Sequence, residues 1–153
     1  MSLKNYRKKR DFDSTKEPEV SGEKIEKNVF VVQKHDAKKL HYDIRLEIGG
    51  LLKSWAIPKG PSLDPSMKRL AIPTEDHPIE YLDFEGKIPK GSYGAGFVIV
   101  WDKGKYENRT FKDQKKLSMK NAYKNGHITV LLKGQKLKGE FSFIKLEGKI
   151  NGC

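Results

Sequence analysis

The chain has 153 residues, 36% of them hydrophobic and 10% aromatic, which is enough apolar mass for one globular domain and excludes wholesale disorder. Lysine and arginine number 31 against 20 acidic residues, so the net charge is +11 and favours polyanionic partners, nucleic acid first among them. The alternative is a lysine-rich surface that serves solubility alone.

Residues 1–27 are polar and carry charges of both signs, with little apolar periodicity before Val29. We therefore predict an N-terminal arm over 1–27 and a β domain over 28–153. From Val29 onward, short runs rich in Val, Ile, Tyr and Phe are bounded by glycine and proline, which is typical of an all-β barrel or sandwich. The predicted strands are Val29–Gln33, His41–Ile48, Leu51–Pro58, Arg69–Pro73, Gly96–Asp102, Ile128–Lys133 and Lys138–Leu146.

Turn and capping residues complete the predicted architecture. Gly49-Gly50 and the segment around Gly134 are hairpin signals, and residues 79–94 look like a loop. Asp113 is the predicted N-cap of one helix that runs through Tyr123, and Gly126 follows as its C-terminal glycine. We expect a mainly β protein, a compact β-barrel with short helical elements and an N-terminal arm.

The predicted strand His41–Ile48 alternates between two kinds of side chain. One face carries Tyr42, Ile44, Leu46 and Ile48, and the other carries His41, Asp43, Arg45 and Glu47. Such alternation alone is typical of a strand with one solvated face. Because His35 lies one lysine-rich turn before it, however, His35, His41 and Asp43 can converge as two imidazoles and a carboxylate. This set suits a divalent transition metal, and it also serves iron oxygenases, so iron stays open.

Two further groups point to phosphoryl chemistry. Arg45 would project beside the metal with a planar guanidinium suited to a phosphate. Glu75 and His77 share a face by the period of two, and His77 would donate to a phosphate or a leaving group. The alternative for His77 is a surface histidine hydrogen-bonded to an acid. We assign no function to His127.

A basic row near an aromatic side chain is a weaker signal for nucleic-acid binding. Lys53, Lys59 and Arg69 flank Trp55, and such a set can grip a sugar-phosphate backbone while the ring packs on a base. Core packing of Trp55 is the favoured interpretation. The glycine-rich segment 86–96 lacks the lysine-serine pair of a P-loop, so it indicates no nucleotide site.

The cysteine count and the length of the apolar runs limit the cellular compartments that we expect for this protein. Cys153 is the only cysteine, which excludes an intrachain disulfide and a cysteine zinc cluster and indicates a reducing environment. The longest apolar runs, such as Phe97–Trp101, are far shorter than a membrane helix, and the N-terminus lacks a signal-peptide apolar region. We expect a soluble, cytoplasmic protein.

Two long segments resemble a known family. They are FVVQKHDAKKLHYDIRLEIGGLLKSWAIPKGPSLDP and EDHPIEYLDFEGKIPKGSYGAGFVIVWDKGKY. Both closely resemble the 3′-phosphoesterase domain of bacterial and archaeal DNA ligase D. The resemblance runs from Tyr6 to Tyr106, includes KRDF at Lys9–Phe12, and extends more loosely to the end of the chain.

The resemblance implies a β-barrel with a manganese-dependent site that trims 3′ ends during double-strand break repair. Its activities are stepwise removal of a terminal 3′ ribonucleotide and removal of 3′ phosphates. The resemblance implies that His35, His41 and Asp43 are the metal ligands and that Arg45 and His77 contact the phosphate. Supporting roles near the scissile phosphate are implied for Arg10, Asp11, Lys59, Arg69, Glu75 and Tyr81. The arm at Arg10-Asp11 would then fold back over the site.

The chain also departs from the family pattern. It has no Lys-x-Asp-Gly nucleophile motif of a ligase, so we expect a stand-alone enzyme. Phe141 stands where similar sequences tend to have tryptophan, and the lysine-rich region 103–126 matches poorly. The expected substrate is a DNA primer-template with a 3′ ribonucleotide or 3′ phosphate, and a separate ligase, polymerase or end-binding protein is an expected partner. The alternative is a catalytically silent basic β-barrel that binds nucleic acid without a metal.

Overall fold

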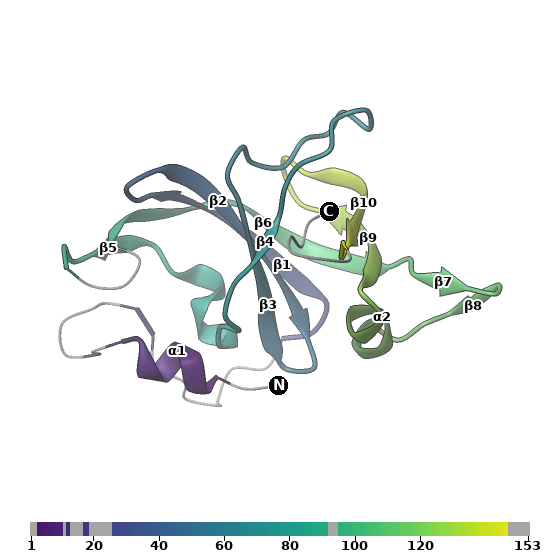
Figure 1. The fold of residues 1–153 in the computed structure, drawn as a ribbon, viewed down its shortest axis with the longest axis horizontal. Helices are drawn as coiled ribbons and strands as arrows, with labels where there is room; N and C mark the ends of the chain where they lie inside the picture. The colour runs from purple at the N-terminus through teal and green to yellow at the C-terminus, as the bar shows by residue number, and fades with distance from the viewer. Residues whose placement is uncertain (1–2, 11, 13–16, 19–25, 92–94, 147–153) are drawn as a thin grey trace.

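The computed structural model describes residues 3–10, 12, 17–18, 26–91 and 95–146, and its main feature is an antiparallel sheet curled into a half-barrel (Figure 1). The main-sheet strands are β1 (Val29–Asp36), β2 (Leu40–Ile48), β3 (Leu51–Ile57), β4 (Ile72–Pro73), β5 (Gly86–Ile88), β6 (Gly96–Asn108), β9 (His127–Lys133) and β10 (Lys138–Ile144). The other elements are α1 (Lys4–Lys8), the 3₁₀ helix η1 (Ile79–Asp83), β7 (Phe111–Lys112), β8 (Lys115–Lys116) and α2 (Met119–Asn125). The prediction of a mainly β, barrel-like fold with short helical elements is confirmed.

The order of the strands places β1 and β2 at the centre of the sheet. The path runs β10-β9-β6-β1-β2-β3-β4, and β5 pairs with β6 outside it. The Gly49-Gly50 turn joins β2 to β3 as predicted, and both glycines have positive φ. A strand is present in each of the seven predicted segments, although several ends differ.

The largest difference in strand length is in β6, which was predicted to end at Asp102 and continues to Asn108. Gly104 falls inside it, at a place where glycine ordinarily marks a break. A Cβ on Gly104 would lie 2.3 Å from the carbonyl oxygen of Lys133, so this glycine permits close approach of β9. The predicted strand Arg69–Pro73, in contrast, is reduced to β4.

The helix predicted from Asp113 to Tyr123 is wrong in its first half. Asp113 and Gln114 have φ of 52° and 67° and form the turn of the hairpin β7–β8. The helix α2 begins only after Ser118, whose side chain accepts a hydrogen bond from a backbone N–H of the first turn. Aspartate is favoured both at an N-cap and in a turn that needs positive φ, which explains the error. Gly126 ends α2 in the left-handed conformation, as predicted.

Two segments predicted without regular structure contain short elements. The predicted loop 79–94 includes η1 and β5, and the predicted arm 1–27 includes α1. Tyr6 of α1 is fully buried, which local polarity did not indicate. No helix among the described residues is long and apolar enough to cross a membrane.

Hydrophobic side chains cover both faces of the central strands. The first core contains Ile44, Leu46 and Ile48 of β2, as predicted, together with Trp55, which is 8% exposed. The second core contains Tyr6, Val31, Leu52, Tyr81 and Leu82, among others. The face of β2 that carries Asp43 and Arg45 is therefore turned toward protein rather than toward bulk water. Charges on this face lie in a medium of low dielectric constant, where they interact strongly.

A β-bulge in β6 adjusts the two faces near the site. Val32 pairs with Asp102 whereas Gln33 pairs with Val100, so Trp101 is one extra residue. Before the bulge, Val98 and Val100 pack with the second core, whereas Tyr106, which would share their face in an unbroken alternation, packs with the first core after it. The bulge thus lets one strand contribute side chains both to the wall of the site and to the opposite core.

Asp102, next to this bulge, anchors the turn between β9 and β10. It is 4% exposed, and its carboxylate accepts four backbone N–H hydrogen bonds of 2.7–3.2 Å, three of them from Gln135, Lys136 and Leu137. We expect Asp102→Ala to lower the free energy of unfolding in urea by about 3 kcal/mol, because the buried donors lose their acceptor. The exposed acid Glu140 is the control, and an equal loss in Glu140→Ala would contradict this role.

Candidate metal centre and phosphate-binding pocket

Two histidines and an aspartate meet where β1 and β2 pair. His35 is opposite His41 in the register and Gln33 is opposite Asp43, so all four side chains share one face. Nδ1 of His35 lies 3.5 Å from Oδ2 of Asp43, and Nε2 of His41 lies 3.3 Å from Oδ1 of the same carboxylate. One candidate ligand atom from each residue lies within 4.8 Å of the others. The three residues expected to bind the metal therefore form one compact cluster.

The protonation of this cluster fits a cation. Nδ1 of His41 is 3.1 Å from the carbonyl oxygen of Lys39, which can only accept, so this nitrogen carries the proton. The lone pair of neutral His41 then lies on Nε2 and faces a carboxylate oxygen. Two acceptors 3.3 Å apart repel unless a proton or a metal cation lies between them. Two imidazoles and one carboxylate at this separation fit a divalent transition metal.

In the absence of a metal, a proton on Nε2 of His41 satisfies the same contact, and the pKa values of Asp43 and His41 reflect it. Burial alone would raise the pKa of Asp43, but hydrogen bonds from both histidines and the charge of Arg45 hold this pKa well below its usual range. The hydrogen bond to Asp43 in turn raises the pKa of His41, against a smaller opposing effect of burial. Asp43 is therefore a permanent negative charge at the centre of the cluster.

Arg45 lies between this cluster and a second group of polar residues. It is 4% exposed, and its Nε donates to Oε1 of Gln33 over 2.8 Å. Its Nη2 is 3.7 Å from Oδ2 of Asp43, and its Nη1 is 3.2 Å from Nδ1 of His77. The guanidinium is thus held in one orientation beside the candidate metal ligands, with the planar fork that recognises phosphate.

Gln33 fixes the orientation of Arg45. It is fully buried, and its amide nitrogen donates to the carbonyl oxygens of Tyr81 and Phe84 at 3.2 and 3.0 Å. These two bonds turn the amide oxygen toward Arg45. The ring of Tyr81 covers the guanidinium from another side, with its centroid 4.8 Å from Cζ.

His77 forms the far side of the pocket. Its backbone pairs with Leu52 of β3, and its Nδ1 lies 2.9 Å from the carbonyl oxygen of Glu75. Burial lowers the pKa of His77 well below the usual value, and the charges of Arg45 and Arg10 lower it further. The imidazole is therefore neutral at neutral pH. With Nδ1–H on the carbonyl, Nε2 is left as an acceptor 3.4 Å from Nη2 of Arg10.

Arg10 reaches the pocket from the N-terminal segment. Its Nε donates to Glu17 over 2.9 Å, its Nη1 donates to Glu75 over 2.6 Å, and its Cζ lies 4.0 Å from the centroid of the Tyr6 ring. The hydroxyl of Tyr81 donates to the same oxygen of Glu17 over 2.7 Å. A second guanidinium is thus fixed opposite Arg45 by two carboxylates and an aromatic ring.

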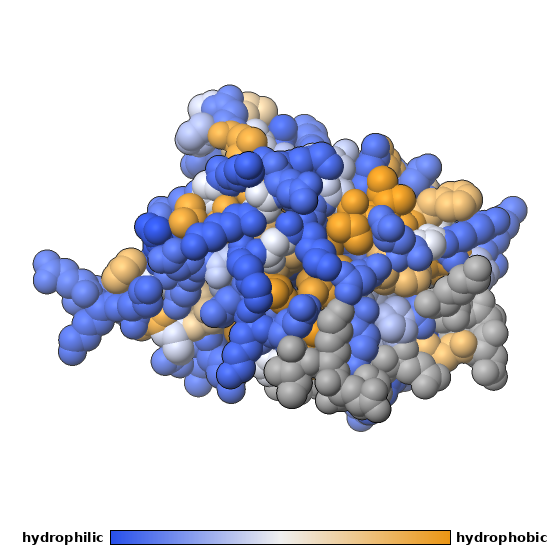
Figure 2. All heavy atoms as spheres, turned by 180° about the vertical axis from the view of Figure 1, so that it is seen from behind, coloured by the Kyte–Doolittle hydropathy of each residue, from blue (hydrophilic) through white to orange (hydrophobic). Residues whose placement is uncertain are grey.

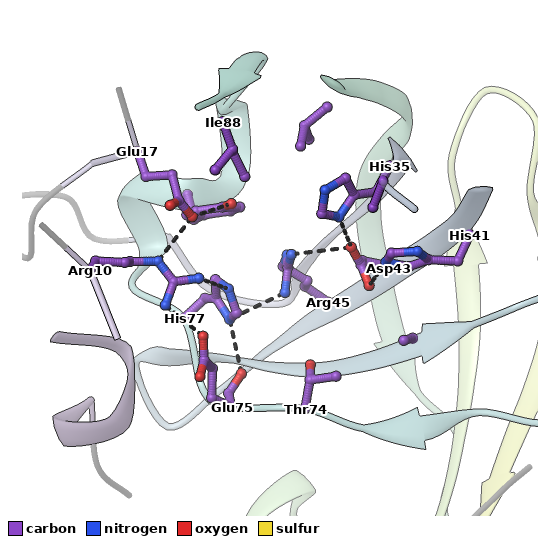
Figure 3. A pocket seen from close by; sticks show the side chains of 14 residues that line it. Arg10, Glu17, His35, His41, Asp43, Arg45, Thr74, Glu75, His77 and Ile88 are labelled. Atoms are coloured by element: carbon purple, nitrogen blue, oxygen red, sulfur yellow. Dashed lines mark hydrogen bonds and ion pairs between the residues drawn. The ribbon is translucent and has the colours of Figure 1, made fainter. Parts of the chain in front are cut away.

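These groups line one pocket of about 250 Å³ (Figure 3). The lining residues include eight of the predicted site residues, namely Arg10, His35, His41, Asp43, Arg45, Glu75, His77 and Tyr81. Figure 3 shows the triad at one end, Arg45 in the middle, and Arg10 with His77 and Glu75 at the other end. The volume is below the roughly 300–1,000 Å³ of sites for drug-sized ligands and suits a phosphate group.

Comparison with known proteins decides the family. A family model described as the DNA Ligase D 3′-phosphoesterase domain matches residues 33–145, a segment that contains the triad, Arg45 and His77. The chain belongs to this family. It is thus a domain of the phosphoesterase kind, and the resemblance inferred from the sequence is confirmed.

The relatives of this phosphoesterase domain are much longer proteins. It is 51% identical to the multifunctional non-homologous end joining protein LigD of Pseudomonas aeruginosa, over 96% of this chain. It is 44% identical to LigD of Mycolicibacterium smegmatis and 43% identical to LigD of Mycobacterium tuberculosis, over 96% and 95% of this chain. The chain spans 17–19% of the length of these relatives.

Three predicted site residues of the phosphoesterase domain are not among the described residues that line the pocket. Lys59 is exposed after β3, Arg69 is half-buried, and neither lines the pocket. Asp11 lies outside the described residues. Their roles at the phosphate remain predictions.

Sequence reasoning missed two residues that organise the pocket. Gln33 precedes His35 by two positions on the same strand face, so the period of two contained a signal for it. Glu17 carries no comparable signal, because it lies in a polar segment and meets Arg10 and Tyr81 only through the tertiary fold.

Proposed function

We propose that this phosphoesterase domain is a manganese-dependent enzyme that processes 3′ ends of DNA at primer-template junctions during break repair. It cleaves the phosphodiester of a terminal 3′ ribonucleotide and removes the remaining 3′ phosphate. The observation that carries the proposal is the placement of Arg45 directly beside the metal-ligand triad, with Nη2 3.7 Å from Oδ2 of Asp43. The end-joining names of the relatives support DNA ends as the substrate.

His35, His41 and Asp43 would hold the metal. A bound divalent metal supplies Lewis-acid polarisation of a phosphoryl oxygen. The donor set contains nitrogen and oxygen but no thiolate, which favours manganese or a similar divalent transition metal and disfavours calcium. The catalytic set is completed by Arg45, Glu75 and His77.

The remaining groups bind the phosphate and compensate its charge. Arg45 and Arg10 present two guanidiniums to one pocket, and both are held by acceptors that do not move with the substrate. Neutral His77 faces Nη2 of Arg10 with the acceptor Nε2 and carries no charge, so charge compensation in the transition state falls on the guanidiniums. Glu75 positions Arg10 through its carboxylate and His77 through its backbone carbonyl. The guanidinium N–H groups of Arg45 and Arg10 are therefore already in position where negative charge develops in the transition state.

The decisive experiment uses a 5′-labelled primer-template whose primer ends in one ribonucleotide. With manganese, the purified protein is expected to shorten the labelled strand and to leave a 3′ hydroxyl, whereas calcium supports little activity. A chelator should abolish shortening, and manganese should restore it. Binding without shortening would favour the alternative, a silent basic nucleic-acid-binding module. Shortening that resists the chelator would contradict the metal assignment.

The place of this reaction in repair follows from its product. A strand that ends in a 3′ hydroxyl is what a polymerase extends and what a ligase seals. We therefore propose a DNA ligase, a polymerase or an end-binding protein as functional partners, in the cytoplasm.

A further inference from the structure

The hairpin β7–β8 has no role in the pocket and projects from the opposite end of the molecule (Figure 1). We call residues 111–116 the basic hairpin. It forms a two-stranded sheet of its own, and all six residues are exposed. Figure 2 shows the same projection from behind as a mostly hydrophilic arm. An arm of this kind contributes little to either core.

Hydrogen bonds fix the base of the basic hairpin to β9. The hydroxyl of Thr110 donates to the carbonyl oxygen of Thr129 over 3.1 Å and accepts from the N–H of Thr129 over 2.9 Å. The side chain of Asn108 donates to the carbonyl oxygen of Leu117 over 2.5 Å. These bonds hold the direction of the arm although its tip packs against no core.

The tip has the chemistry of a surface for polyanions. It carries three lysines and one aspartate, a net charge of two positive. Lys112 is directly opposite Lys115 in the register, and like charges at that distance destabilise a hairpin. On the other face, the Phe111 ring is 58% exposed, and Nζ of Lys116 lies 5.8 Å from its centroid. Bound phosphates would relieve the repulsion between the lysines.

The distance from the pocket to the hairpin corresponds to about one turn of duplex DNA at the base of the hairpin and somewhat more than one turn at its tip. Strand β6 runs from Val98, which lines the pocket, through the bulge at Trp101 to Asn108 at the base of the hairpin. Ten residues of extended strand span at most about 33 Å, and the hairpin adds about 10 Å, so the base and the tip of the hairpin lie up to about 33 and 43 Å from the pocket. One turn of B-DNA is about 34–36 Å long. When the 3′ end of a duplex enters the pocket, a groove of that duplex can therefore face the hairpin about one turn further along.

We propose that the basic hairpin binds the backbone of duplex DNA about 10–13 base pairs from the 3′ end held in the pocket. A two-stranded ribbon fits the width of the major groove, and its lysines reach phosphates on either side. This inference rests on the proposed function, because that function places a DNA end in the pocket.

The test compares two stem-loop substrates with the same ribonucleotide-ended junction, one with a stem of about 8 base pairs and one of about 20. Binding is measured by fluorescence anisotropy across a salt series. The double variant Lys112→Gln/Lys115→Gln is expected to bind the long stem about 30-fold more weakly at about 0.15 M salt, with the slope of log K against log salt reduced by about 1.8. Binding of the short stem should stay within about twofold, because a short stem cannot reach the hairpin.

A charge-matched control separates local contact from the general field of the protein. Lys68→Gln/Lys138→Gln removes two charges elsewhere, so any loss of affinity should be the same for both stems. Equal losses for both stems in the hairpin variant would overturn the proposal, as would no loss for either stem. No loss of affinity for either stem would indicate that the hairpin binds a protein rather than DNA.

Further readouts keep this test independent of the proposed function. The hairpin variant should trim the short stem at the parental rate, which also shows that it is folded. Phe111→Ser keeps every charge and should weaken binding of the long stem alone by a few-fold. If the parental protein binds but never trims, the proposed function fails, and the dependence of binding on stem length still decides the role of the hairpin.

Discussion

Replacement of Arg45 by lysine is expected to lower the rate of 3′-end trimming by about 10²–10³-fold, although the positive charge is kept. An ammonium group cannot donate to Gln33 and at the same time present two parallel N–H groups to a tetrahedral phosphate. It also forms no planar stack under the ring of Tyr81. The measurement is the single-turnover rate on a ribonucleotide-ended primer-template, and Arg45→Ala should be slower still.

Arg109→Lys is the matched control for this substitution. Arg109 is a partly exposed arginine that pairs with Glu107 at the far end of the molecule, so the same chemical change there should leave trimming unaltered. Near-normal turnover by Arg45→Lys would show that Arg45 is only a structural strand residue. Another group, such as Arg69, would then have to meet the phosphate.

The period of two in β2 explains why much of the site was predictable. It separated Ile44 and Leu46 from Asp43 and Arg45, and the structure places the first two in a core and the second two in the pocket. Alternation does not reveal what covers the polar face. That cover comes from η1 and from Tyr6 of α1, whose contacts with β-strand residues form only in the folded chain.

Local chemistry also misled the prediction where one residue type serves two structures. Asp113 satisfies the rule for a helix N-cap and equally the rule for a tight turn, and the turn is the one formed. The contact of Glu17 with Tyr81 is of another kind, because no local pattern encodes a pairing across 64 residues of sequence. Lys59 and Arg69 were singled out both by the basic row beside Trp55 and by the family resemblance, and neither lines the pocket.

Removal of one metal ligand should separate binding from chemistry. His41→Ala is expected to lower trimming by more than the roughly 100-fold that loss of an outer partner of a metal site costs, because a ligand itself is lost. Affinity for a primer-template at low salt should stay nearly unchanged at about pH 8, where a histidine carries little charge. A net charge of +11 would attract DNA, and a neutral His41 contributes nothing to that charge.

The matched control for His41→Ala is His127→Ala, since His127 is an exposed histidine on β9 outside the pocket. His41 is itself partly exposed, so its removal should leave the two cores and the midpoint of thermal unfolding nearly intact. Anisotropy titrations measure binding, and strand shortening with manganese measures chemistry. A silent nucleic-acid-binding module has no activity to lose and therefore cannot give this separation. A folded His41→Ala protein that trims at the parental rate would exclude His41 as a ligand, and the mechanism built on the triad would fail with it.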